Sequence, residues 1–253
     1  MPELGQWQVS VSLCTVDSML YIVATPIGNL EDISGRALRI LGEVDVIACE
    51  DTRQTLKLLN HYGLKASLTA FHSHNMRKAA PRLLELLRQG KRIALVTDGG
   101  TPGISDPGSY LVALAREQEV KITPIPGPSA LSTILSVSGA ATGQIIFAGF
   151  LSPKGGRRRS QLKMLLDRGE GVVLFESPHR ILKLLADLQT LAPERMCLIG
   201  REMTKVHEEF LKGFPEKLLT EMAVRTTIRG ELSLFVMPKK NIKLNVKHDD
   251  TGK

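Results

Sequence analysis

The segment RIALVTDGGTPGISDPG, residues 92–108, indicates most clearly how this chain folds. An apolar run at 93–96 leads directly into a loop rich in glycine and proline. A short apolar run that ends in such a loop is typical of a buried strand followed by a turn. The segment therefore predicts a strand at 92–97 and a polar loop at its carboxyl end, which is where open α/β sheets bind ligands.

Further strands and helices alternate on both sides of this segment. The other expected strands are at residues 20–24, 44–49, 67–71, 120–125, 145–150, 171–175, 196–200 and 232–237. The expected helices are at about 33–41, 53–62, 79–89 and 107–118, from 130 onward, up to 167, up to 190, and at 215–222. Strands that alternate with helices predict an α/β protein.

The length suits two domains of this kind. A chain of 253 residues is long enough for a substantial core. We expect two unlike α/β domains, at residues 19–126 and 127–238. The first 18 residues fit neither domain and are expected to be dispensable, and residues 239–253 form a polar tail.

The composition excludes several classes of protein. Apolar residues make up 43% of the chain and charged residues 23%, as in ordinary globular proteins. No apolar run is long enough to cross a membrane as a helix, and no basic cluster opens the chain, so we expect no membrane partner and a cytoplasmic location. The three cysteines, Cys14, Cys49 and Cys197, are far apart, which disfavours a zinc ribbon or a disulfide framework.

The net charge of +7 arises entirely in the second half of the chain. Basic and acidic residues balance in residues 1–125, and the densest basic run extends from Lys154 to Arg168. We place this run in a loop between a strand and a helix. A localised basic surface favours a polyanionic partner, although a solvated basic loop would have the same composition. Aromatic residues are only 4%, which disfavours a base-stacking platform.

The chemistry-bearing residues lie in five loops at predicted strand ends. These loops are TPIGN (25–29), EDTR (50–53), DGGTPG (98–103), ESPHR (176–180) and REMTK (201–205). The chain lacks a P-loop, a Rossmann glycine fingerprint, an HExxH motif and a GxSxG elbow. His72 and His74 have no third ligand nearby in the sequence, so no metal site is predicted. The segment PGPSA (126–130) suits the first turn of a helix, where anions bind.

Together these loops resemble the tetrapyrrole methylase superfamily, and within it the members that methylate ribosomal RNA. The matching motifs are LYIVATPIGNLEDIS (20–34), ACEDTR (48–53), TDGGTPGISDPG (97–108), PIPGPSA (124–130), GFLSPKGGRRR (149–159), FESPHR (175–180) and REMTKVHEE (201–209). They span about residues 20–237. Gly100 stands where relatives often have alanine, and we expect it to loosen the loop.

The resemblance implies an S-adenosylmethionine-dependent enzyme that forms homodimers and binds its cofactor in a cleft between two α/β domains. The implied reaction is 2′-O-methylation of a cytidine ribose in the decoding region of small-subunit (16S) ribosomal RNA. The implied cofactor residues are Pro26, Ile27, Gly28, Asp98, Gly100, Thr101, Ser129, Ala130, Phe175 and Glu176. The substrate would be ribosomal RNA or the assembled small subunit.

Catalytic and RNA-binding residues are chosen by charge at the same strand ends. The catalytic candidates are Glu50, Arg53, Glu176 and Arg201, and the sequence does not say which carboxylate is the base. The RNA-binding candidates are Lys154, Arg157, Arg158, Arg159, Arg180 and Lys205. Two alternatives stay open: an enzyme of the same fold that methylates a tetrapyrrole carbon or a protein histidine, and a non-catalytic ribosome-assembly factor.

Overall fold

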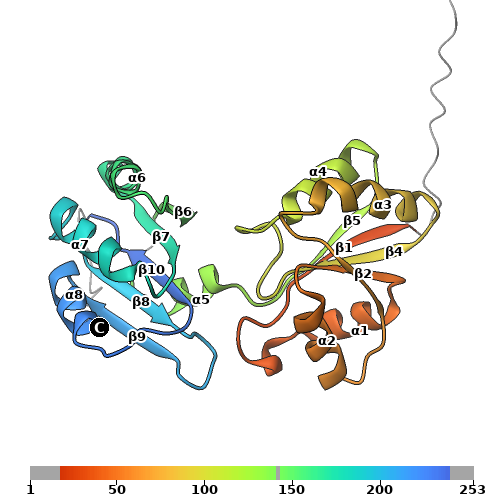
Figure 1. Cartoon of the computed structure of the whole chain (residues 1–253), viewed down its shortest axis with the longest axis horizontal. Coiled ribbons are helices and arrows are strands. Elements are labelled where there is room, and N and C mark those ends of the chain that lie inside the picture. Colours follow the sequence, from red (N-terminus) through yellow and green to blue (C-terminus); the bar gives the residue numbers. More distant parts are fainter. Residues whose placement is uncertain (1–17, 141–142, 240–253) are drawn as a thin grey trace, which may run out of the picture. The chain divides into compact units, whose positions relative to one another are not determined.

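The computed structural model describes residues 18–140 and 143–239, which form two compact units (Figure 1). The first unit contains the described residues up to Thr133 together with Met203–Val206, and the second contains the others. From the sequence we expect the domain boundary between residues 126 and 127, with each domain formed by one continuous segment. Nearly all of the N-terminal extension and of the C-terminal tail lies outside the described residues, so the expectations for them stay untested.

The first unit is built on one parallel sheet in the order β3-β2-β4-β1-β5. Its strands are β1 (Met19–Val23), β2 (Val46–Cys49), β3 (Ser67–Ala70), β4 (Arg92–Val96) and β5 (Ile122–Ile125). Its helices are a 3-10 turn (Leu30–Asp32), α1 (Gly35–Glu43), α2 (Thr52–His61), α3 (Met76–Arg88) and α4 (Gly108–Glu117). The strand at 92–97, predicted from the opening motif, is thus the central strand of this sheet.

Helices bury both faces of this sheet, which explains why its strands are almost continuously apolar. On β4, Ala94 and Val96 belong to the core beneath α1 and α2. Ile93 and Leu95 belong to the core beneath α3 and α4. Successive side chains of a strand point to opposite faces, so one short apolar run contributes to two cores.

The second unit holds a mixed sheet in the order β6-β7-β10-β8-β9, in which only β6 and β7 run parallel. Its strands are β6 (Ile145–Phe150), β7 (Gly171–Glu176), β8 (Cys197–Arg201), β9 (Glu209–Gly213) and β10 (Leu232–Val236). Its helices are α6 (Gly155–Asp167), α7 (Ile181–Leu191) and α8 (Pro215–Ala223), which share one core with the sheet. Helix α5 (Ala130–Ser136) begins in the first unit and ends in the second.

Two elements of the second unit differ from the sequence-based expectation. Strand β9 was not predicted, because its sequence EFLKG is short and carries two charged residues. The basic run expected in a loop forms most of α6, which begins at Gly155. No helix in the described part of the chain is long and apolar enough to cross a membrane.

Candidate functional site

The loops after β1 and β4 lie where the chain reverses its direction across the first sheet. From β1 the chain crosses β4 to reach β2, whereas from β4 it crosses β1 to reach β5. Helices α1 and α4 therefore cover opposite faces, and the loops that precede them diverge. Ligands of open α/β sheets bind at such a switch point. The predicted cofactor loops 25–29 and 98–103 occupy it.

Backbone hydrogen bonds join these two loops. The N–H of Thr25 donates to the carbonyl of Gly100 over 3.0 Å, and the N–H of Gly100 donates to the carbonyl of Thr25 over 2.9 Å. Gly100 has a φ of +90°, a conformation in which an alanine would be strained. We expected Gly100 to loosen the loop, but its conformation shows instead that glycine suits this turn.

The segment Met203–Val206 packs against the loop after β1. The N–H of Asn29 donates to Oγ1 of Thr204 over 3.1 Å. A Cβ atom placed on Gly28 would lie 2.7 Å from Oγ1 of Thr204 and 3.0 Å from the carbonyl oxygen of Met203. Real Cβ atoms do not approach other atoms so closely, so the packing of this segment requires glycine at position 28.

A small cavity of about 270 Å³ lies among these loops of the first unit. It is lined by Ile27, Asp32, Pro128, Thr133 and Thr204. Of these five residues, the sequence-based choice of cofactor residues included only Ile27; Asp32, Pro128, Thr133 and Thr204 were not among its candidates. Thr204 belongs to the REMTK motif, in which the sequence-based candidates are the charged residues Arg201 and Lys205.

The other predicted cofactor residues of the first unit belong to the same group of loops. Oγ1 of Thr101 donates to the carbonyl of Pro128 over 3.2 Å. Ser129 and Ala130 follow Pro128 directly at the start of α5, a helix of only seven residues. The side chain of Lys205, which we had assigned to RNA, lies against Gly28.

Carboxylates gather at the carboxyl ends of β2 and β4. Oδ1 of Asp98 accepts a hydrogen bond from the N–H of Asp51 over 3.0 Å. Burial raises the pKa of Glu50, and the negative charges of Asp98 and Asp106 raise this pKa further. The exposed Arg53 bonds Asp51 at 2.8 Å and lowers the pKa of Asp51 to about 2. Of the catalytic candidates in the first unit, Glu50 is therefore partly buried among acids, and Arg53 is exposed beside them.

In the second unit, Glu176 and Arg180 bond each other after the end of β7. Oε1 of the buried Glu176 accepts hydrogen bonds from Nε of Arg180 over 2.6 Å and from the N–H of Ser177 over 2.7 Å. Its Oε2 is buried without a hydrogen-bond partner in the described part of the chain. Arg180 also donates to the carbonyl of Leu151 over 3.3 Å. These contacts stabilise the loop, and the cofactor, catalytic and RNA roles of the two residues stay predictions.

Phe175, the predicted cofactor contact beside Glu176, lies in a group of three aromatic rings. Its ring centroid is 5.0 Å from that of Phe147 and 5.8 Å from that of Phe150, with the rings inclined edge to face. Phe150 is 58% exposed, which is unusual for so large an apolar side chain. The end of β7 thus presents an apolar aromatic surface.

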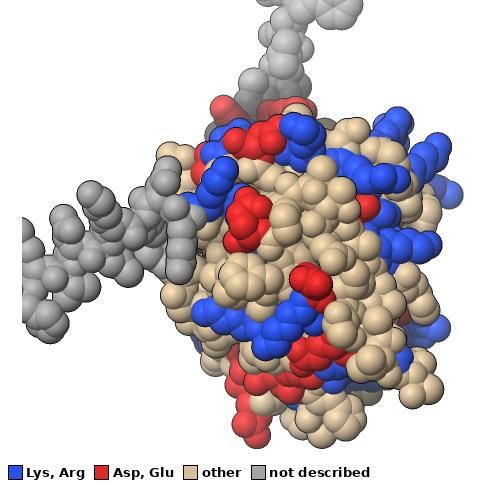
Figure 2. All heavy atoms as spheres, turned by 90° about the vertical axis from the view of Figure 1, so that its left-hand side faces the viewer, with Lys and Arg blue, Asp and Glu red and all other residues tan. Residues whose placement is uncertain are grey.

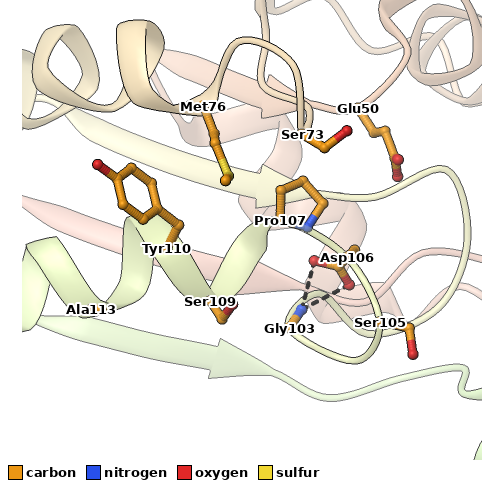
Figure 3. Close-up of a pocket in the computed structure, with 10 residues that line it drawn as sticks. All are labelled: Glu50, Ser73, Met76, Gly103, Ser105, Asp106, Pro107, Ser109, Tyr110 and Ala113. Carbon is orange, nitrogen blue, oxygen red and sulfur yellow. Dashed lines mark hydrogen bonds between the residues drawn. The ribbon is translucent and has the colours of Figure 1, made fainter. Parts of the chain in front are cut away.

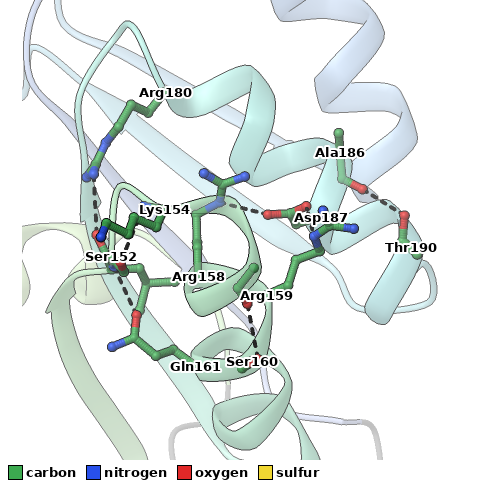
Figure 4. A network of polar contacts seen from close by, with 12 residues as sticks. Ser152, Lys154, Arg158, Arg159, Ser160, Gln161, Arg180, Ala186, Asp187 and Thr190 are labelled. Atoms are coloured by element: carbon green, nitrogen blue, oxygen red, sulfur yellow. Dashed lines mark hydrogen bonds and ion pairs between the residues drawn. The ribbon is translucent and has the colours of Figure 1, made fainter.

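The basic run on α6 divides into one buried arginine and several exposed cations. Nε of Arg158 donates to Oδ2 of Asp187 over 2.7 Å, and both side chains are almost fully buried (Figure 4). Arg159 approaches the same carboxylate at 3.5 Å but is 61% exposed. Lys154 and Arg157 are exposed as well. The assignment of Arg158 to RNA binding therefore needs correction, because its guanidinium holds α6 to α7 and is inaccessible to a phosphate.

Figure 2 shows one face of the molecule on the side of the second unit. Lys and Arg side chains gather along the right-hand side of this face, where few Asp or Glu are visible. Acidic and basic side chains mix over its middle and lower parts. On this face the basic side chains are therefore gathered on one side, as a surface that contacts a polyanion requires.

Arg201, the last catalytic candidate, belongs to an ion cluster at the end of β8. Its Nε donates to Glu209 over 2.8 Å, and Arg225 pairs with the same carboxylate at 2.6 Å. The hydrogen bond from Arg225, with the one from Arg201, lowers the pKa of Glu209 to about 2. The cluster joins β8, β9 and the segment after α8, which gives Arg201 a structural role and leaves its catalytic role a prediction.

No group of three His, Cys, Asp or Glu side chains that could hold a metal ion occurs within residues 18–140 and 143–239. The rings of His72 and His74 lie 6.0 Å apart in an edge-to-face arrangement. Nδ1 of His72 is buried without a hydrogen-bond partner in the described residues.

Three curated relatives match most of this chain. A protein of Coprothermobacter proteolyticus is 44% identical over 222 residues, which cover 88% of this chain and 99% of that protein. A protein of Synechocystis sp. is 46% identical, and the aligned part covers 86% of this chain and 78% of that protein. A protein of Thermotoga maritima is 43% identical, and the aligned part covers 87% of this chain and 99% of that protein. All three are named ribosomal RNA small subunit methyltransferase I.

Solved structures show the same fold at much lower identity. A cobalt precorrin-4 methyltransferase of cobalamin biosynthesis superimposes with a TM-score of 0.64 at 17% identity, covering 87% of this chain and 95% of that one. A uroporphyrin-III-C-methyltransferase from Thermus thermophilus superimposes with a TM-score of 0.60 at 19% identity, covering 87% of this chain and 94% of that one. The family model for tetrapyrrole (corrin/porphyrin) methylases matches residues 19–218. The chain therefore belongs to the tetrapyrrole methylase family and, within it, to the ribosomal RNA small subunit methyltransferase I proteins.

Proposed function

We propose that this protein transfers a methyl group from S-adenosylmethionine to the 2′-hydroxyl of a cytidine ribose in the decoding region of small-subunit ribosomal RNA. The observation that carries the proposal is the group of loops at the switch point of the first sheet, which closes around a cavity of about 270 Å³. The relatives, which are named for methylation of this RNA and match almost the whole folded chain, support the same assignment.

The residues of the loop group fit the proposed cofactor. Ile27 and Pro128 offer apolar contacts for an adenosine moiety, and Asp32 offers a carboxylate that suits ribose hydroxyls or an ammonium group. Asp98 adds a second carboxylate at the end of β4. We assign binding in the first unit to the loops that carry Pro26, Ile27, Gly28, Asp98, Gly100, Thr101, Ser129 and Ala130, and in the second unit to Phe175 and Glu176.

The cofactor supplies a methyl group that is already activated on a sulfonium, so the protein has to align three atoms. Orientation of this kind contributes about 7–11 kcal/mol to a rate acceleration. A base for the ribose hydroxyl would add roughly 10²- to 10⁴-fold. Among the catalytic candidates, Glu50 is the carboxylate whose pKa is raised, and Glu176 is the one that is fully buried. Glu50 is therefore the more accessible of the two to an RNA.

The RNA is held by exposed cations of the second unit. Lys154, Arg157 and Arg159 are exposed at the start of α6 and suit phosphate contacts. The proposal also includes a homodimer and an action in the cytoplasm, where bacterial ribosomes are assembled. Both follow from the resemblance to the family, and sedimentation at micromolar concentration would measure the first.

One experiment separates this function from its two alternatives. Small subunits lacking the modification are incubated with the protein and labelled S-adenosylmethionine, and the digested nucleosides are separated. The proposal expects labelled 2′-O-methylcytidine from the small subunit. A tetrapyrrole or histidine methylase would label neither RNA nor subunits. An assembly factor would bind the subunit and leave the label on the cofactor.

A further inference from the structure

A second, wider cavity of about 850 Å³ lies in the first unit, at the carboxyl ends of β2 and β4 (Figure 3). The loop after β4 connects it with the cofactor loops. Residues 98–101 of this loop belong to the loop group, and Gly103, Ser105, Asp106 and Pro107 line the cavity. A cavity of this size exceeds what a single nucleoside needs and falls in the range of ligand sites. No cofactor residue predicted from the sequence lines it.

Hydrogen bonds to one carboxylate brace the wall of this cavity. The carboxylate of Asp106 accepts hydrogen bonds from the N–H groups of Gly103 over 2.9 Å, Ile104 over 3.2 Å and Gly108 over 2.8 Å. Ser105 is held between them at a φ of +72°, which is rare for a residue with a Cβ. A pre-formed wall lowers the cost of ordering on binding.

The acidic lining of the cavity disfavours a phosphate. Its lining holds the carboxylates of Glu50 and Asp106 and includes neither Lys nor Arg. The carboxyl of Glu50 is partly buried and lines the same cavity as that of Asp106, and buried carboxyl oxygens are costly to leave without a hydrogen-bond donor. The ligand must therefore bring N–H or O–H groups, and any phosphates attached to it must remain outside.

Apolar side chains form the other part of the lining. Figure 3 shows Tyr110, Met76 and Pro107 in a row that leads to Ser73 and Glu50. An aromatic ring suits the face of a planar base, since bases stack on aromatic side chains, and a thioether suits the edge of such a ring. The cavity therefore offers a stacking surface at one end and a hydrogen-bond acceptor at the other.

We propose that this cavity receives the target cytidine, with its base against Tyr110 and Met76 and its exocyclic amino group donating to Glu50. The proposal rests on the proposed function and adds to it the place and the recognition of the substrate. A carboxylate accepts from the amino group of cytosine, whereas uracil presents a carbonyl oxygen at the same position. Glu50 is thus a specificity-determining residue that selects cytidine over uridine.

The test compares small subunits reconstituted with cytidine or with uridine at the methylated position. The wild-type protein is expected to prefer cytidine strongly. In Glu50→Gln the amide can donate to the uracil carbonyl, so the preference for cytidine over uridine should fall by roughly 10- to 100-fold. Glu85→Gln, an exposed glutamate on α3 outside the cavity, is the matched control and should keep the wild-type preference.

A second variant tests the stacking surface, and a binding measurement tests whether both variants are folded. Tyr110→Leu should weaken RNA binding by roughly 5- to 100-fold through lost stacking, while the preference for cytidine persists. Calorimetry with S-adenosylmethionine should give wild-type affinity for both variants, because neither residue lies in the cofactor loops. That result also shows that the variants are folded.

The possible outcomes separate this inference from the function on which it rests. If the wild-type protein methylates the subunit and Glu50→Gln keeps the full preference, the cavity does not read the base and the inference is overturned. If Glu50→Gln loses activity equally on cytidine and uridine, Glu50 acts on the ribose that both share, which also overturns it. If the wild-type protein methylates no subunit, the proposed function itself fails.

Discussion

Exposed and buried arginines of α6 should respond differently to substitution. We predict that the double variant Arg157→Ala/Arg159→Ala weakens binding to the small subunit and lowers its salt dependence. Both side chains are exposed, and each can neutralise one phosphate. Arg158→Ala should leave the salt dependence unchanged and destabilise the protein instead, because its guanidinium is buried against Asp187.

The expected change in salt slope follows from the exposure of Arg157 and Arg159, and the expected loss of folding free energy follows from the burial of Arg158. Each phosphate contact contributes about 0.7–0.9 to the slope of log affinity against log salt, so the double variant should lower the slope by up to about 1.4–1.8. Between about 50 and 200 mM salt, the wild-type affinity should then fall roughly 7- to 12-fold more than that of the variant. Removing one partner of a buried ion pair costs about 3 kcal/mol of folding free energy.

Two measurements on the same samples decide the question. Affinity for small subunits is measured across a salt titration, and urea unfolding gives the free energy of folding. Lys163→Ala serves as the control, since this residue lies on the same helix and pairs with Asp167. An Arg158 variant of normal stability with a reduced salt slope would refute the division into buried and exposed arginines.

Other predictions concern the loop group, the ion cluster and the N-terminus. Gly28→Ala should displace Met203–Val206 and lower S-adenosylmethionine affinity in calorimetry; unchanged affinity would contradict the close packing described for this loop. Asp98→Ala should weaken cofactor binding without unfolding the protein, and an unaltered binding isotherm would remove Asp98 from the site. Glu209 has a pKa of about 2, below its ordinary value, so its pairing stabilises the fold above about pH 4.5 and this contribution disappears as the pH falls toward 2. Glu209→Gln should therefore lose about 1–2 kcal/mol at pH 7, allowing for its partial exposure, and show a flatter acid unfolding curve; a curve of wild-type shape would argue against the pairing. A chain that starts at Met19 should fold and methylate normally, and loss of either property would make the first 18 residues an integral part of the protein.

The sequence by itself determined most of the strands and helices and the positions of the polar loops that follow the strands. Strand β4 and its glycine-rich loop could be predicted because a buried parallel strand is apolar along its whole length and its end is marked by residues with special backbone preferences. The same local signals located the loops after β1, β7 and β8. The family resemblance rests on these loops, which explains why the fold and the activity could be predicted together.

Only the tertiary structure decided what each side chain of these loops contacts. Arg157, Arg158 and Arg159 are identical in sequence terms, but α6 buries one of them against Asp187 and leaves the other two exposed. Thr204 joins the loop after β1 because its segment packs on a glycine about 175 residues earlier in the chain. Burial and pairing depend on contacts between residues far apart in the sequence, and a local pattern does not contain them.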